Sequence, residues 1–280
     1  MAKAAILARP ASSEMSVTLE HITPQIAARM LEANTNNRPA RNGLIQSYAD
    51  DMRAGRWQMN GDAIRFNVNG QLMDGQHRLL AVVRSGLAIS SLVIRNLPAE
   101  AFQTIDGGAT RKAGDLLNLM DVKNANTVAS VARMAILYET GLAQQRKVSR
   151  TAIVEFVEQH PYTVEAVRLA RPAGRGGHLN AAPVSAVIFL ANERRYYDDE
   201  ITSFLEGIVE GAGLERGDPR LALREWSVNE RMRNHGKLNT TVTFAAVARA
   251  WNAYVKGEKL IVIKPNKNPD RSNTQIVGLD

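Results

Sequence analysis

Five consecutive residues, Asp74, Gly75, Gln76, His77 and Arg78, have types and spacing that could bind an anion. They stand just before an apolar run with helical periodicity. The first N–H groups of a helix lack intrahelical partners and lie at the positive end of its dipole, so they attract phosphate. A glycine lets a ligand approach the main chain, while Gln, His and Arg side chains supply donors. We therefore expect a phosphate site here.

Asp74 has a different charge from the rest of this group. A carboxylate repels phosphate unless Mg²⁺ lies between them. Its position directly before the helix also suits a cap for the free N–H groups. The alternative interpretation of the whole stretch is a solvated first helical turn after an Asp-Gly turn, with no ligand.

The flanking periodicity predicts the elements that position this stretch. Residues 63–68 alternate between apolar and polar side chains, as in a half-buried strand. Asn69-Gly70 then predicts a hairpin, and the apolar stripe over 79–83 predicts a helix that ends at Gly86. Further strands are expected over 17–22 and 88–96, and further helices over 24–33, 42–55 and 98–105.

The chain changes character near residues 121–124. Strand and helix patterns are mixed before this point, whereas every patterned segment after it is helical. We expect an α+β domain over residues 17–121, an all-helical domain over 122–262, and flexible tails over 1–16 and 263–280.

The segment from Asp74 to Gly86, "DGQHRLLAVVRSG", resembles the signature box of the ParB/sulfiredoxin-like superfamily. ParB partition proteins have Gly-Glu-Arg-Arg there, and sulfiredoxin has Gly-Cys-His-Arg. The flanking "NNRP" and "IDGGATR" lie where ParB has an arginine after prolines and a Glu-Asn-x-x-Arg segment. The resemblance covers Val17 to Met120. The DGQHR variant is similar to one in phage and mobile-element proteins labelled ParB-like.

This resemblance implies a ParB/sulfiredoxin-like fold with a pocket for a nucleoside triphosphate, CTP as in ParB or ATP as in sulfiredoxin, with Mg²⁺. The nucleotide-binding residues that it implies are Arg38, Gly75, Gln76, His77, Arg78 and Arg111. Asp106 would lie near the metal ion and the phosphates.

Gln76 departs from both relatives, because it replaces the glutamate of ParB and the cysteine of sulfiredoxin. The chain has no cysteine, which excludes disulfides, thiolate metal sites and the sulfinic-acid repair chemistry of sulfiredoxin. A glutamine is also a poor general base, which puts nucleotide hydrolysis in doubt. If the protein is a triphosphatase, phosphotransferase or nuclease, the candidate catalytic residues are Asp74 and Asp106.

Charge and one helical pair point to DNA. The formal net charge is +7 and the pI is about 9.8, which suits a polyanionic partner or serves solubility alone. Residues 149–160 could form the second helix of a helix-turn-helix, with Arg146, Lys147 and Arg150 facing DNA. ParB proteins also carry a helical DNA-binding unit after the nucleotide domain. Because the connector over 141–148 is long for that motif, simple helix packing is the alternative.

The remaining features concern the protein's surroundings. No apolar run approaches the roughly 20 residues of a membrane span, and the start of the chain is too interrupted for a signal peptide. The histidines show no metal-ligand spacing. We expect a cytoplasmic protein with no membrane contact and no protein-bound metal centre, with a homodimer left open.

Three functions are open at this stage. The leading hypothesis is a ParB-like protein that binds nucleotide and associates with DNA. The second is a nucleotide-dependent phosphotransferase (kinase) or a nuclease. The third is a DNA-associated protein that has kept the fold and lost nucleotide use.

Overall fold

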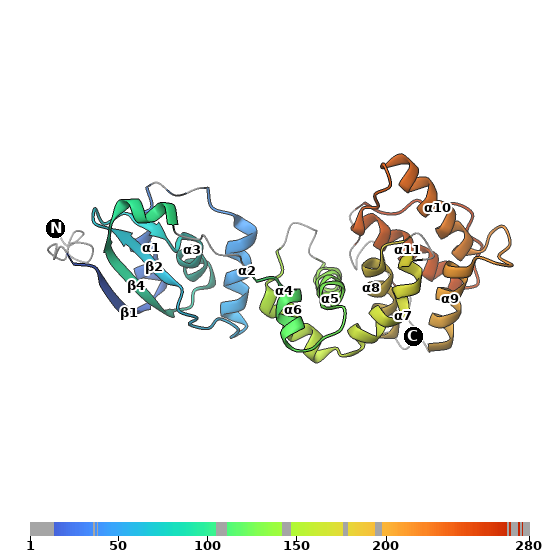
Figure 1. Cartoon of the computed structure of the whole chain (residues 1–280), viewed down its shortest axis with the longest axis horizontal. Coiled ribbons are helices and arrows are strands. Elements are labelled where there is room, and N and C mark those ends of the chain that lie inside the picture. The colour runs from blue at the N-terminus through green and yellow to red at the C-terminus, as the bar shows by residue number, and fades with distance from the viewer. Residues whose placement is uncertain are drawn as a thin grey trace. The chain divides into compact units, whose positions relative to one another are not determined.

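The computed structural model (Figure 1) divides into two compact units, Met1–Thr110 and Arg111–Asp280. It describes residues 14–35, 37, 39–104, 111–141, 147–175, 179–193, 198–267, 269, 274 and 276, without the side chains of 102–104 and 198. The regular elements described in the first unit are strands and helices, and those in the second are helices. The expected mixture of strands and helices is therefore confirmed.

A small mixed sheet forms the centre of the N-terminal unit. Its strands lie in the order β1-β4-β2-β3; β2 and β4 run parallel, and the other two pairs are antiparallel. The elements in chain order are β1 (Ser16–Ile22), α1 (Pro24–Leu31), α2 (Asn42–Arg53), β2 (Ala63–Asn67), β3 (Leu72–Asp74), α3 (Gln76–Ser85), β4 (Ile89–Leu97) and a 3₁₀ helix, η1 (Ala99–Thr104). The helix expected over 98–105 is thus a 3₁₀ helix in the described part.

Local sequence signals explain the termini of these elements. Thr23 Oγ1 accepts a hydrogen bond from the Ile26 N–H at 3.3 Å, and Pro24 opens α1. Gly70 closes the hairpin turn with a φ of 73°, and its N–H donates to the carbonyl oxygen of Asn67 at 2.9 Å. Gly86 ends α3 in the left-handed conformation with a φ of 75°.

One face of the sheet packs against α1, α2 and α3. The buried side chains of β2 and β4, such as Ile64 and Val93, lie directly opposite each other and belong to the same core as Met30, Ile45 and Leu79 of the three helices. This single apolar face gives α3 a fixed place at the end of β3, because the two elements are separated only by Gly75.

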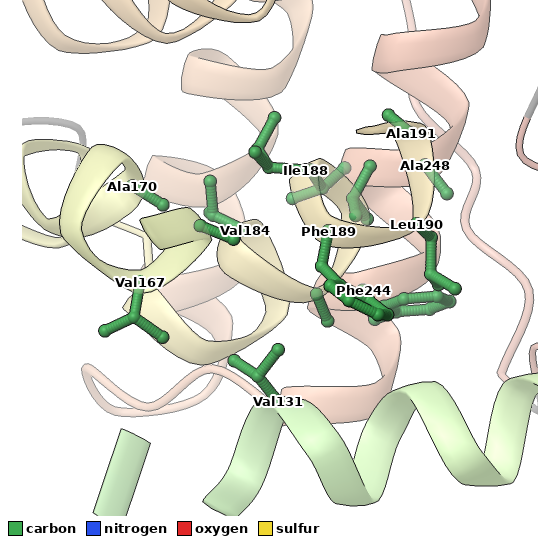
Figure 2. Packing of buried hydrophobic residues seen from close by; sticks show 14 of the residues in the cluster. Val131, Val167, Ala170, Val184, Ile188, Phe189, Leu190, Ala191, Phe244 and Ala248 are labelled. Atoms are coloured by element: carbon green, nitrogen blue, oxygen red, sulfur yellow. The ribbon is translucent and has the colours of Figure 1, made fainter. Parts of the chain in front are cut away.

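The helical unit has its own core (Figure 2). Its described helices are α4 (Ala113–Leu119), α5 (Ala125–Glu139), α6 (Arg150–Gln159), α7 (Tyr162–Arg175), α8 (Ala181–Asn192), α9 (Asp198–Glu210), α10 (Pro219–Arg233) and α11 (Thr240–Val255). Helix α8 is apolar on all sides, and residues 183–191 are all buried. Figure 2 shows Ile188 and Phe189 of α8 among Val131 of α5, Val167 of α7 and Phe244 of α11.

Two boundaries differ from those expected. The division between the units falls at Thr110, before α4, because Ala113 and Leu117 of α4 are buried in the helical core. The expected flexible tail over 263–280 does not hold at Ile263 and Ile276, which are 6% and 3% exposed in the same core. Burial removes these apolar side chains from water, which lowers the free energy of the folded state.

Candidate functional site

The N-terminus of α3 lies where the sequence places it, directly after β3. Gly75 precedes the helix with a φ of 104°, and a Cβ atom there would lie 2.9 Å from Cγ1 of Ile64. Only glycine meets both constraints without strain. The helix has no side-chain cap and no acidic residue in its first turn. Its positive end is therefore not neutralised by a first-turn acid.

Asp74 binds two arginines instead of capping α3. Its Oδ2 accepts hydrogen bonds from Nη1 of Arg65 at 2.5 Å and from Nη2 of Arg78 at 3.0 Å. Its Oδ1 accepts from the N–H of Gly75, the residue before the helix, at 2.7 Å. The expectation that this carboxylate caps the helical N–H groups is wrong. The carboxylate instead binds Arg65 of β2 and the side chain of Arg78 in α3.

Arg78 has one engaged and one unengaged nitrogen. Nη2 donates to Asp74 and also to the carbonyl oxygen of Ala63 at 2.9 Å. Nη1 is buried and has no hydrogen-bond partner among the residues that the structure describes. A buried donor without an acceptor costs about 1–3 kcal/mol, so this nitrogen favours an acceptor oxygen from outside the described residues.

Gln76 and His77 are buried, with 6% and 9% of their surfaces exposed. Oε1 of Gln76 accepts from Nδ2 of Asn34 at 3.1 Å, and Nε2 of His77 accepts from the N–H of Arg41 at 3.1 Å. The sequence argument placed both side chains as donors at an open helix end. In the structure both accept hydrogen bonds from the chain between α1 and α2.

That chain is fixed to the same corner of the unit by further bonds. Nδ2 of Asn37 donates to the carbonyl oxygen of Leu72 at 2.7 Å and to Oδ1 of Asn34 at 2.6 Å. The N–H of Leu72 donates to the carbonyl oxygen of Ala33 at 2.9 Å. The described residues between Ala33 and Arg41, here called the α1–α2 loop, therefore bind both β3 and the start of α3.

Several participants were missed by sequence reasoning. Arg65 had a partial signal, because equal steps outward from Asn69-Gly70 place it opposite Asp74, with which it pairs, although the register of the hairpin shifts between Arg65 and Phe66. The contacts of the α1–α2 loop had none, since they depend on how the chain returns to α3.

The remaining predicted site residues fall into two groups. Arg38, Asp106 and Arg146 lie outside the described residues. Arg111, predicted to contact nucleotide, lies beside a predicted DNA-binding residue, because Nη1 of Arg150 donates to its carbonyl oxygen at 3.3 Å. Lys147 is exposed shortly before α6, and Ser149 caps that helix.

The described ranges contain neither a metal-ligand cluster nor a membrane-spanning helix. No group of three or more histidine, aspartate or glutamate side chains is arranged to hold a metal ion. No helix there has both the length and the hydrophobicity needed to cross a membrane.

Comparison of the chain with protein-family models, with curated proteins and with solved structures found no match.

Proposed function

We propose that the N-terminal unit binds the phosphates of a nucleoside triphosphate, CTP or ATP, at the start of α3, and that the helical unit associates with DNA. This is the function of a ParB-like nucleotide-binding protein. The order of elements around "DGQHR", a hairpin strand followed by Gly75 and a helix, supports the resemblance on which the proposal rests.

The observation that carries the proposal is an uncapped helix start next to a buried donor that has no partner among the described residues. The N-terminus of α3 has neither a side-chain cap nor a first-turn acid. Beside it, Nη1 of Arg78 is buried with no partner in the described part of the chain. Phosphate oxygens would be attracted by the positive helix end and would accept a hydrogen bond from the guanidinium group.

Phosphate binding at this site requires an exchange of partners. Nη2 of Arg78 lies 3.0 Å from Oδ2 of Asp74, so a phosphate would compete with that carboxylate for the guanidinium group. The α1–α2 loop, bonded to Gln76 and His77, would have to move or provide part of the pocket. Nucleotide binding is thereby coupled to the conformation of this loop.

Mg²⁺ fits Asp74 poorly in this arrangement. Both carboxylate oxygens accept hydrogen bonds. Oδ2 accepts from two arginine side chains and Oδ1 accepts from a backbone N–H. Mg²⁺ prefers an approach by free carboxylate oxygens together with phosphate oxygens and water. The same bonds make Asp74 a weak candidate for the general base of a phosphotransferase, since its Oδ2 is already held by two arginine side chains.

DNA association would use the basic residues near the start of α6. Arg111, Lys147 and Arg150 are exposed and come from two segments that meet where Arg150 binds the Arg111 carbonyl. Arginine and lysine side chains near a helix N-terminus can bind the phosphates of the DNA backbone. The net charge of +7 acts in the same direction.

The test is a titration of the purified protein with CTP and ATP by calorimetry. Arg78→Ala should weaken binding about 10- to 100-fold, because it removes charge-assisted hydrogen bonds. Arg84→Ala is the matched control, since Arg84 is exposed at the last turn of the same helix and its side chain donates to Asn42. No binding by the wild type, or equal binding by both variants, would reject the proposal.

Asp74→Asn gives the titration a second arm. This change removes a negative charge beside the phosphates and weakens the competition for Arg78, so binding should tighten by about tenfold. If the variant instead loses binding only when Mg²⁺ is present, Asp74 holds the ion and the assignment of its role here is wrong.

A second candidate is favoured by the internal bonds of the site. Gln76 and His77 are buried under the α1–α2 loop and Arg78 is paired with Asp74, as in a unit that has lost nucleotide use. DNA binding that depends on salt but not on nucleotide, together with no nucleotide binding in the titration, would support this candidate.

A further inference from the structure

Strand β1 is at the edge of the sheet and pairs only with β4 among the described strands. Its other edge presents main-chain donors and acceptors along seven residues. Natural proteins protect such edges with prolines, lysines, bulges or a covering segment. Within the described residues, β1 contains no proline or lysine, and its pairing with β4 shows no register shift.

The side chains of β1 are arranged in the opposite sense to those of an ordinary surface strand. Val17 and Leu19, which are 52% and 63% exposed, point away from the face that the helices cover. Thr18 and Glu20 point to the covered side, opposite Val93 and Ser91 of β4. An antiparallel strand with one solvent-exposed face normally exposes its polar residues and buries its apolar ones.

The polar inner side of β1 is satisfied within the unit. Arg95 forms an ion pair with Glu20, and Oγ1 of Thr18 donates to Oε1 of Glu20 at 2.6 Å. Arg95 also lies over the ring of Phe66, 5.7 Å from its centre. The only acidic side chain of the strand is therefore held away from the outer edge and does not block a new strand there.

We propose that β1 of one chain pairs antiparallel with β1 of a second copy, so that the two sheets become continuous in a two-fold symmetric dimer. The axis passes beside Thr18. Main-chain hydrogen bonds between the two edges would supply affinity, and alternate side chains would supply specificity, as in other cases of strand addition.

The sequence of β1 is complementary to itself in this register. Val17 of each copy lies beside Leu19 of the other, which gives two apolar cross-strand pairs on the exposed face. Ser16 lies beside Glu20, so the two acidic residues do not face each other. No two like charges are opposed, and the exposed Met15, at 59%, meets His21. These pairs use the apolar side chains that the isolated unit leaves in water.

Sedimentation velocity over a concentration series tests the proposal with the full chain. The wild type should show a reversible monomer–dimer equilibrium. Leu19→Lys should raise the dimer dissociation constant about tenfold, because the two-fold axis removes two apolar pairs with one substitution. Leu87→Lys is the matched control, as Leu87 is an exposed leucine of the same unit outside β1, and should leave the dimer unchanged.

A charge pair tests the partner and the register. Val17→Glu combined with Leu19→Lys places a carboxylate of each copy beside an ammonium group of the other, so the double variant should recover dimerisation that Leu19→Lys loses. A wild type that stays monomeric at every concentration, a dimer that Leu19→Lys leaves intact, or a double variant that stays monomeric would overturn the proposal. Circular dichroism confirms that each variant is folded.

Discussion

Gly75 and Gly86 flank α3 and both have a positive φ, of 104° and 75°. Their surroundings differ. A Cβ atom at Gly75 would lie 2.9 Å from Cγ1 and 3.3 Å from Cα of Ile64, whereas nothing lies within 4 Å of one at Gly86. Gly75 is therefore required both by its positive φ and by the close approach between the helix start and β2. Gly86 is required only by its positive φ.

Alanine substitution separates these two requirements. Gly86→Ala should cost about 1 kcal/mol from the left-handed backbone alone. Gly75→Ala should cost about 2–4 kcal/mol, because it adds overpacking against Ile64. Urea-dependent amide exchange of β2 and α3 measures both losses. Equal losses of stability in the two variants would mean that Ile64 moves aside freely and that the close approach does not contribute to the requirement for glycine.

At the scale of elements, α10 shows how a cap and an ion pair combine. Asp218 caps the helix, since Oδ1 accepts from the N–H of Arg220 at 2.8 Å. The Arg220 side chain binds both oxygens of the same carboxylate and lies 4.9 Å from the ring centre of Tyr254. Hydrogen bonding by Arg220, reinforced by its charge and by backbone N–H groups, lowers the pKa of Asp218 although burial opposes this.

The direction of that shift predicts a pH dependence. Because the pKa of Asp218 is lower in the folded state, its contribution is complete above the unfolded value of about 3.9 and is lost as pH falls through the folded pKa. Asp218→Asn keeps a capping side chain but removes the charge. We expect the variant to be about 1 kcal/mol less stable at pH 7 and to match the wild type in strong acid.

Urea unfolding at the two pH values measures this difference. Glu165→Gln is the control, since Glu165 also pairs with an arginine on a helix, Arg168, but both side chains are well exposed to solvent. Exposed pairs contribute little, so this variant should show no measurable change. A loss for Asp218→Asn that persists unchanged at low pH would show that the charge is not its cause.

At the scale of the whole molecule, the described residues form two hydrophobic cores. One joins the sheet to α1, α2 and α3, and the other joins the helices of the C-terminal unit. The second core takes in residues far along the chain, because Ile276 is 3% exposed and its N–H donates to the hydroxyl oxygen of Tyr138 on α5 at 3.0 Å. Ile276 thus binds a helix near the start of the unit.

Truncating this side chain should affect one unit only. Ile276→Ala should lower the stability of the helical unit by about 2–4 kcal/mol, as for other buried isoleucines. Ile261→Ala, at a position that is 55% exposed, is the matched control and should change little. Hydrogen-exchange mass spectrometry should show faster exchange in α5 and unchanged exchange in the sheet. Equal loosening of both units would mean that they unfold together.

Much of the N-terminal unit was predictable because its signals are local. The alternation of residues 63–68, the Asn69-Gly70 turn and the glycines at both ends of α3 each depend on neighbours within a few positions. The same holds for the Thr23 cap of α1. The α+β unit, the helical unit and the place of "DGQHR" before a helix could therefore be read from the sequence.

The tertiary structure alone decided the partners of the site residues. Sequence reasoning left Asp74 and Arg78 as separate groups, whereas folding brings Asp74 between Arg78 and Arg65. Folding also buries Gln76 and His77 under the α1–α2 loop, although their residue types suggested an exposed set of hydrogen-bond donors. Local patterns fix which elements form, but which polar groups meet depends on where distant segments return, because a buried polar group takes whichever partner the packed chain brings within hydrogen-bonding distance.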